Sequence, residues 1–363
     1  MRFEHETLPQ RVCFATGEAK AMLAGEVARL DASRVMVIAS AAEAGRAEHV
    51  VGDLPVVYRH DEVVMHVPVS VAEQARAAAK AHDVDVVVCV GGGSATGLAK
   101  AVALTTGLPI VAVPTTYAGS EATNVWGLTE ASRKTTGIDD RVLPVSVIYD
   151  AELTLSLPVG LSVASGVNGL AHCIDSMWAP RADPINGALA VEGIRALAAG
   201  LPAIATDPHN VPGREQALYG AYLSAVAFAS AGSGLHHKIC HVLGGAFDLP
   251  HAQTHATVLP YVLAFNAAAA PEAERRIASA FGASTAVDGL ERLRRQLGAP
   301  TALHDYGFRS ADIDGAVEAI LPVVPRSNPR PVAAEELRRL LDAAQRGSDP
   351  RTMTMKTTDR SQP

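Results

Sequence analysis

Cysteine and aromatic residues are both scarce in this chain. Only four of its 363 residues are cysteines, and phenylalanine, tryptophan and tyrosine together make up 4%. The cysteines lie apart in apolar segments and never in a C-x-x-C spacing, the spacing typical of metal-binding and redox pairs. We therefore expect buried free thiols in a reducing cytoplasm rather than a disulfide framework.

The sequence also lacks a basic block, a targeting signal and a membrane-length apolar run. The net charge is −7, and no lysine–arginine cluster is interleaved with aromatic residues, which disfavours nucleic-acid binding. The N-terminal MRFEHETLPQ has no charged-then-apolar signal pattern, and no apolar run reaches the length of a membrane span. These absences predict a cytoplasmic protein with neither a nucleic-acid nor a membrane partner.

What the chain does have is a pattern of short β-branched segments alternating with alanine-rich helical segments over its first 150 residues. This alternation predicts a parallel, Rossmann-like sheet in an α/β domain over residues 1–155. Long Ala/Leu-rich segments then predict an all-helical domain over residues 156–346, and the polar residues 347–363 predict a disordered tail. The predicted strands are Arg34–Ser40, Leu54–Arg59, Asp85–Val90, Pro109–Pro114 and Ser146–Tyr149.

A glycine-rich segment, GGGSATGLAK, follows the most apolar predicted strand and opens a helix. Backbone N–H groups at a helix start bind phosphate, and glycines let a pyrophosphate approach the backbone closely. Gly91, Gly92, Gly93 and Ser94 are therefore candidate pyrophosphate-binding residues, although an ordinary βα turn has the same pattern. The segment is not the G-x-G-x-x-G fingerprint of standard Rossmann domains.

The end of the second predicted strand carries no signal for one nicotinamide cofactor over the other. An acid there favours NAD and an arginine accommodates NADP. The strand ends at Ala39 and Ser40. We therefore expect NADH, NADPH or both as the cofactor.

A hydroxyl-rich segment, PTTYAGSEATN, follows the next predicted strand. Ligands bind at the carboxyl ends of parallel strands, so Thr115, Thr116 and Ser120 are candidates for the cofactor or substrate cleft. The alternative is a turn whose hydroxyl groups bond to their own backbone.

Seven of the thirteen histidines lie between positions 172 and 255. Spacings of four residues place Asn168 and His172, His237 and His241, and His251 and His255 on shared helix faces. Three segments can therefore direct polar side chains to one point.

Two chemistries are open for this cluster. A metal site would use Asn168, His172, His237 and His251, but asparagine supplies a neutral oxygen where iron and zinc sites usually have an anionic ligand. Alternatively, the rings act directly by donating to an oxyanion and delivering a proton. Asp175, one turn from His172, is placed to orient a neighbouring ring. Any single histidine could instead be a satisfied core residue.

These motifs, in this order, resemble the iron-containing (group III) alcohol dehydrogenases from about residue 8 to residue 345. The motifs are the triple-glycine loop, PTT with GSE, N-x-x-x-H, and H-x-x-x-H followed by PH. The resemblance implies a dinucleotide-binding domain, a helical domain and a nicotinamide between them. It places Asn168, His172, His237 and His251 at the ligand positions of the iron enzymes, and His241 near the nicotinamide.

The chain departs from the metal-dependent members in ways that resemble the maleylacetate reductase branch. Asn168 replaces their aspartate ligand, Gly97 replaces an aspartate in the glycine loop, and the PTT segment is one residue shorter. The resemblance implies NAD(P)H-dependent reduction of maleylacetate to 3-oxoadipate, in the degradation of resorcinol, hydroxyquinol and chlorinated aromatics. It also implies a homodimer in which a metal is dispensable.

In that branch the histidines form a substrate-binding, proton-donating pocket, which predicts catalytic roles for His172, His237, His241 and His251. Asn168, Lys238 and Tyr117 are expected substrate contacts, although Tyr117 also suits a packing role. Further candidates for carboxylate recognition are Arg181 and Lys134.

Three other functions compete with this interpretation. A metal-dependent alcohol or polyol dehydrogenase of the same fold is the main alternative. A dehydroquinate-synthase-like lyase with bound NAD is another. Both need a competent metal site, which Asn168 disfavours. A non-catalytic binding module is the third, and the combination of a glycine loop with a histidine cluster disfavours it.

Overall fold

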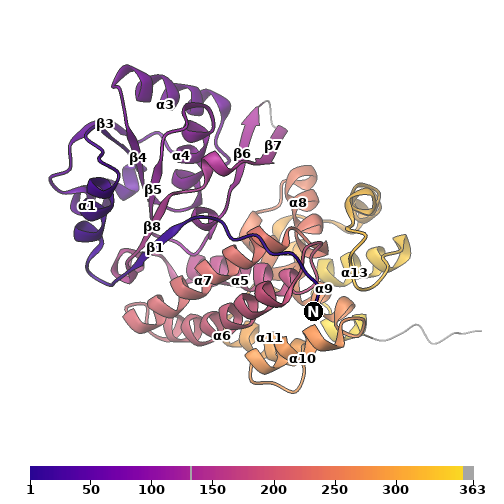
Figure 1. The fold of residues 1–363 in the computed structure, drawn as a ribbon. Helices are drawn as coiled ribbons and strands as arrows, with labels where there is room; N and C mark the ends of the chain where they lie inside the picture. The colour runs from indigo at the N-terminus through magenta and orange to yellow at the C-terminus, as the bar shows by residue number, and fades with distance from the viewer. Residues whose placement is uncertain (131–132, 355–363) are drawn as a thin grey trace, which may run out of the picture.

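The computed structural model describes residues 1–130 and 133–354, without the side chains of residues 133 and 134 (Figure 1). In this part of the chain, a parallel sheet and its covering helices form the N-terminal portion, and helices form the remainder. The predicted fold class is therefore confirmed.

The main sheet has the strand order β1-β8-β5-β4-β2-β3, and each neighbouring pair is parallel. The chain extends the sheet in one direction from β2 to β3 and in the other from β2 to β4. This reversal opens a crevice at the carboxyl ends of the central strands, where α/β proteins bind ligands. The strands are β1 (Arg11–Phe14), β2 (Val35–Ile38), β3 (Val56–His60), β4 (Val86–Gly91), β5 (Ile110–Pro114) and β8 (Ser146–Tyr149).

All five predicted strands are present, and the structure adds three more. Strand β1 is a four-residue edge strand that pairs only with β8, too short to show a pattern. Strands β6 (Val125–Glu130) and β7 (Arg133–Ile138) form an antiparallel hairpin of mixed threonine, glycine and apolar residues. Neither has the apolar run of a buried strand, which is the signal that identified the others.

Helices cover both faces of the sheet and then continue into a bundle. One core cluster packs helices α1 (Ala19–Arg29) and α2 (Ala44–Val51) against one face. The other face packs against α3 (Val69–Ala81) and α4 (Gly93–Thr106), and this second core runs without a break into the helical portion. The two portions therefore share one continuous core.

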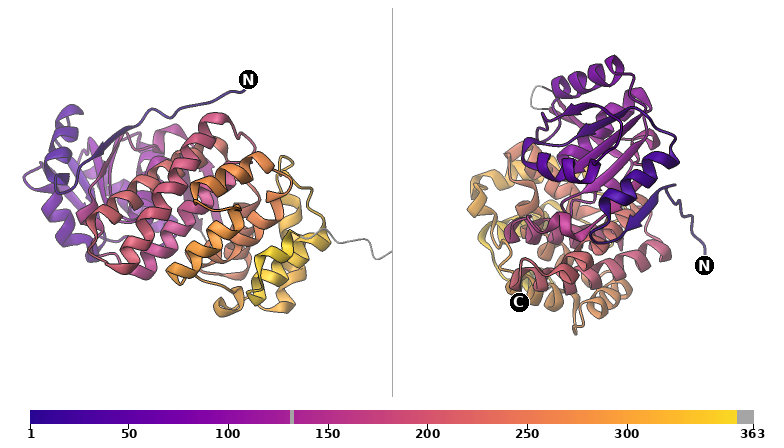
Figure 2. Two further views of the ribbon diagram at one scale, coloured as in Figure 1. Left: turned by 90° about the horizontal axis from the view of Figure 1, so that it is seen from below. Right: turned by 90° about the vertical axis from the view of Figure 1, so that its left-hand side faces the viewer.

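The helical portion lies beyond the carboxyl-end side of this arrangement, and Figure 2 shows its helices stacked away from the sheet. Helices α5, α6 and α7 pack against one another, and α9 packs against both α5 and α8. The helices are α5 (Val159–Ser176), α6 (Pro184–Thr206), α7 (Val211–Ala231), α8 (Leu235–Phe247), α9 (His251–Ala267), α10 (Pro271–Ala280), α11 (Ala286–Leu297), α12 (Ile313–Ile320) and α13 (Ala334–Arg346).

Helix α6 is long and apolar enough to pass a length-and-composition test for a membrane span, and among the described residues it is the one helix that does so. The expectation that no apolar segment reaches this length is therefore wrong. Its contacts with α5 and α7 are among the most extensive in the structure. This packing accounts for its apolar character as that of a core helix.

The disordered tail is predicted to begin at residue 347, which is too early in the sequence. Residues 347–354 are ordered: a short 3-10 helix at Pro350–Met353 buries the Met353 side chain, and Arg351 lies 2.7 Å from the Asp288 carboxylate. One buried methionine and one ion pair create no apolar period, so the sequence pattern did not reveal them. The remainder of the predicted tail, residues 355–363, lies outside the described residues.

Candidate active site

A cavity of about 550 Å³ lies where the sheet meets the helical bundle. Its walls come from the segment before α3, the start of α4, the loop after β5, the β6–β7 hairpin, and helices α5, α7, α8 and α9. The predicted site residues that line it are Gly93, Ser94, Thr116, Ser120, Asn168, His172, His237, His241 and His251. The structure thus brings the glycine loop, the PTT segment and the histidines to one cavity.

The glycine loop continues β4 directly into α4. Gly91 has a φ of +146°, which L side chains rarely adopt. A Cβ atom on Gly92 would lie 2.9 Å from Cγ2 of Thr116, so only glycine lets the two loops pack together. Gly93 begins α4 at the cavity, and the N–H groups of this helix start are available to a phosphate. Gly91, Gly92 and Thr115 support this loop without lining the cavity.

Lys100 is a cavity residue that the sequence analysis did not single out. Its side chain is buried, and Nζ donates to the carbonyl oxygens of Ser120 (2.7 Å), Thr123 (2.8 Å) and Val125 (2.8 Å). The same Nζ lies 3.0 Å from Oγ1 of Thr123. Lys100 therefore ties α4 to the loop between β5 and β6, which forms one cavity wall. Burial lowers the pKa of Lys100 to about 7, and the nearby Glu121 carboxylate opposes this shift.

The histidines meet because α5, α8 and α9 pack side by side. The His172 and His237 rings are stacked with centroids 5.0 Å apart, and Phe228 of α7 stacks on His172 at 4.7 Å. His255 packs behind them, 5.0 Å from His237 and 4.3 Å from His251.

Asp175, at the end of α5, fixes the start of α8 and the orientation of His237. Its buried carboxylate accepts the backbone N–H groups of Gly234 (2.9 Å) and His236 (3.3 Å) and lies 2.7 Å from Nδ1 of His237. A Cβ atom on Gly234 would lie 2.3 Å from Oδ1 of Asp175, so this approach requires glycine. Because a carboxylate only accepts, Nδ1 of His237 carries the hydrogen and Nε2 is left with its lone pair.

Burial and neighbouring imidazoles lower the pKa of His172 and of His237 well below the ordinary value of 6.5. Both rings are therefore neutral at pH 7 in the ligand-free protein. Burial raises the pKa of Asp175, while the backbone N–H groups of Gly234, His236 and His237 oppose that shift. With these donors and the His237 ring beside it, Asp175 remains the acceptor.

Three buried atoms on cavity residues have no hydrogen-bond partner among the described residues: Oδ1 of Asn168, Nδ1 of His172 and Nε2 of His237. Buried polar atoms are nearly always paired in folded proteins. All three belong to residues that line one cavity, which makes this cavity the candidate site for a polar ligand.

The cavity residues that carry these atoms are uncharged. Among the described residues that line the cavity there is no aspartate, glutamate or cysteine. Iron and zinc sites normally include an anionic ligand that neutralises part of the charge. Three imidazoles and an amide therefore fit a divalent ion poorly.

Two predicted substrate contacts need correction. Tyr117 is fully buried, and its hydroxyl accepts from Nη1 of Arg214 (3.1 Å), so it is a packing residue that does not line the cavity. Lys238 follows His237 on α8 but also does not line it. The turn of the helix directs successive side chains to different faces.

Of the two further cations proposed for carboxylate recognition, Arg181 does not line the cavity. Arg181 donates to the carbonyl oxygens of Ser230 and Ala229 at the end of α7. The Lys134 side chain lies outside the described residues.

Apolar cavity residues were also missed. Trp126, Leu157, Leu161 and Phe228 line the cavity beside the histidines. Such residues are indistinguishable from core in a sequence, because only the fold shows which apolar side chains face an empty space.

Comparison with known proteins identifies the family. Residues 9–151 match "Iron-containing alcohol dehydrogenase" and residues 162–345 match "Fe-containing alcohol dehydrogenase family, C-terminal". A maleylacetate reductase of Sphingobium indicum is 44% identical over 97% of this chain and 100% of its own length.

Solved structures agree with these matches. An iron-containing alcohol dehydrogenase from Corynebacterium glutamicum superimposes with a TM-score of 0.96 at 64% identity, covering 97% of this chain and 99% of its own. A maleylacetate reductase from Agrobacterium tumefaciens superimposes with a TM-score of 0.92 at 41% identity, covering 96% and 100%.

The chain belongs to the iron-containing alcohol dehydrogenase family and is an oxidoreductase. Within that family, its resemblance to the maleylacetate reductases is confirmed by curated relatives that are 40–44% identical over nearly the whole chain.

Lys100→Met tests the attachment of α4 to the cavity wall. The pKa of Lys100 falls from 10.5 to about 7 on folding, so the unfolded chain binds more protons between these two pH values. The free energy of unfolding of the wild type should therefore rise relative to the variant from pH 7 toward pH 10, by up to about 1.4 kcal/mol per pH unit. Urea unfolding across this range measures the difference. A difference that does not change with pH would contradict the lowered pKa.

Proposed function

We propose that the protein is a maleylacetate reductase, which uses a reduced nicotinamide cofactor to convert the carbon–carbon double bond of maleylacetate into the single bond of 3-oxoadipate. The observation that carries this proposal is the set of unpartnered buried atoms on Asn168, His172 and His237 in a cavity shared with the glycine loop. The full-length relatives named maleylacetate reductase support the same substrate.

The cofactor would be held by the start of α4. Gly93 and Ser94 present N–H groups to the pyrophosphate, and Gly92 keeps the loop close to Thr116. When bound, the reduced nicotinamide supplies the hydride. Ala39 and Ser40 follow β2 with no acid at the strand end, and the next acid, Glu43, is paired with Arg46, so this chain favours neither ribose form. We therefore propose that it accepts both NADH and NADPH.

The chemistry left to the protein is the handling of negative charge. Maleylacetate is a dianion whose alkene is conjugated to a ketone. Hydride addition to the alkene carbon β to the ketone leaves an enolate oxygen, and a proton must then reach the α carbon. Each fixed hydrogen-bond donor stabilises such an oxyanion by about 3 kcal/mol.

His237 is the ring best placed to move that proton. Asp175 holds its Nδ1–H, so Nε2 is the atom that gains and loses a proton at the cavity. The ring is neutral while the cavity is empty. A bound dianion favours its protonated form, which the adjacent Asp175 carboxylate also stabilises. The four rings are therefore not expected to act alike. His237 offers a lone pair in the ligand-free protein, whereas the remaining residues act as further polar contacts: Asn168, His172, His241 and His251.

The substrate carboxylates would be bound by neutral groups. The described cavity residues include no arginine, and their one lysine, Lys100, is held by loop oxygens. Hydroxyl, amide and imidazole groups, with Ser165 among them, provide the remaining polar surface. We propose that these groups recognise the two carboxylates.

A metal-dependent alcohol or polyol dehydrogenase is the less favoured function. That activity requires an ion to polarise the alcohol oxygen, and the cavity offers no anionic ligand to hold one firmly. We propose that the reaction proceeds without a metal in the cavity.

Loss of NADH absorbance with maleylacetate, after brief treatment with a chelator, tests the proposed function. We expect full turnover under these conditions and no increase on addition of Fe²⁺ or Zn²⁺. The matched control is oxidation of simple alcohols and diols with NAD⁺, for which we expect no turnover. Alcohol oxidation that depends on added Fe²⁺, without maleylacetate reduction, would overturn the proposal in favour of the dehydrogenase.

Asp175→Asn tests the proton-transfer role of His237. The amide would donate to Nδ1 and move the ring hydrogen to Nε2, so we expect maleylacetate turnover to fall by roughly 10²–10⁴-fold. NADH affinity, measured by fluorescence, should stay within about twofold, because Asp175 does not line the cavity. Turnover within a few-fold of the wild type would show that the Asp175–His237 contact is merely structural.

A further inference from the structure

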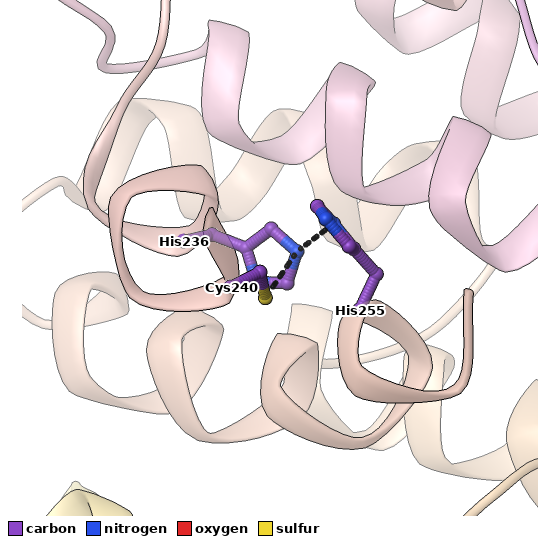
Figure 3. A group of neighbouring side chains, drawn as sticks. All are labelled: His236, Cys240 and His255. Atoms are coloured by element: carbon purple, nitrogen blue, oxygen red, sulfur yellow. Dashed lines mark hydrogen bonds between the residues drawn. The ribbon is translucent and has the colours of Figure 1, made fainter. Parts of the chain in front are cut away.

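Behind the cavity, three metal-ligating side chains meet at a second point. His236, Cys240 and His255 lie between α8 and α9, and their three candidate ligand atoms are all within 4.8 Å of one another (Figure 3). The side chains are 2% exposed or less. His236 and His237 are consecutive on α8, so their side chains leave the helix in different directions. The group is therefore distinct from the cavity residues.

The spacing of these atoms matches a tetrahedral ion. Nε2 of His236 lies 3.0 Å from Nδ1 of His255 and 3.7 Å from Sγ of Cys240. A zinc ion bound at about 2.05 Å to nitrogen and about 2.3 Å to sulfur separates two nitrogens by about 3.3 Å and nitrogen from sulfur by about 3.6 Å. Two of the three separations therefore lie within about 0.3 Å of these values, and the third is no more than 4.8 Å.

The surroundings supply the charge balance that the cavity lacks. Ligation of an ion requires the Cys240 thiolate, which gives one negative charge. The buried Asp175 carboxylate gives a second, and it interacts electrostatically with both His236 and Cys240. Together the two anions would neutralise a divalent cation.

The protein provides few hydrogen-bond partners for the polar atoms of this group. The outer ring nitrogens, Nδ1 of His236 and Nε2 of His255, have no hydrogen-bond partner among the described residues. Of the inner atoms, Nε2 of His236 contacts both Nδ1 of His255 and Sγ of Cys240. Burying two imidazoles and a thiol is costly, and an ion bound to the three inner atoms would offset part of that cost, while the two outer nitrogens would lie away from it.

We propose that His236, Cys240 and His255 bind one divalent ion of the zinc or cobalt type, with water as the fourth ligand. The ion joins α8 to α9, the helices that carry His237, His241 and His251. Its role is to hold these helices together, outside the reaction. It is enclosed by protein, so a brief chelator treatment leaves it in place.

Cobalt incorporation tests this site. The full-length protein is produced in minimal medium with Co²⁺ as the added transition metal, and its absorption spectrum and cobalt content are measured after purification. We expect about one cobalt per chain and a near-ultraviolet sulfur-to-cobalt charge-transfer band. Such a band requires a thiolate ligand, which no residue lining the cavity supplies.

Two variants assign the band. Cys240→Ala should remove both the band and the cobalt, and His236→Asn should do the same if the alanine variant proves insoluble. His172→Gln, a change in the cavity, should retain both. Purified wild type without cobalt, cobalt without a sulfur band, or a band that persists in Cys240→Ala would each overturn the proposal and leave a hydrogen-bonded trio.

Discussion

The buried Asp175 carboxylate is the group on which the rest of the site depends. It lies in the last turn of α5, accepts backbone N–H groups at the start of α8 and holds the ring of His237 by its Nδ1 hydrogen. Removing its charge would leave several buried N–H groups without an acceptor. One side chain thus fixes the junction of α5 with α8 and also determines that Nε2 of His237 carries a lone pair rather than a hydrogen.

On the side of the sheet, the cavity wall is formed by loop backbone rather than by charged side chains. The glycine loop and the PTT segment pack together because Gly92 has no side chain, and Lys100 holds the neighbouring loop in place. The cavity between the two halves is lined by imidazole, amide, hydroxyl and apolar groups. Among the described residues, this lining includes no anionic ligand for a divalent ion.

Much of the fold follows from local sequence patterns, because buried parallel strands are continuous apolar runs. The run before Gly91 identified β4 and the position of the cofactor loop, and the four-residue spacings identified the faces that carry Asn168, His172 and His237. The β6–β7 hairpin has no such run, and residues 347–354 are fixed by tertiary contacts with Asp288 and Tyr261. Tyr117 and Lys238 were misassigned because a sequence position beside a site residue does not give the direction of a side chain. Lys100 was missed because its partners are backbone oxygens distant in sequence.

The central claim is that Asp175 fixes the tautomer of His237 and makes Nε2 the proton-carrying atom of the cavity. A neutron structure of the ligand-free protein in deuterated buffer measures this directly. The account predicts deuterium on Nδ1 of His237, directed at Asp175, and none on Nε2. Deuterium on Nε2 with a bare Nδ1 would contradict it.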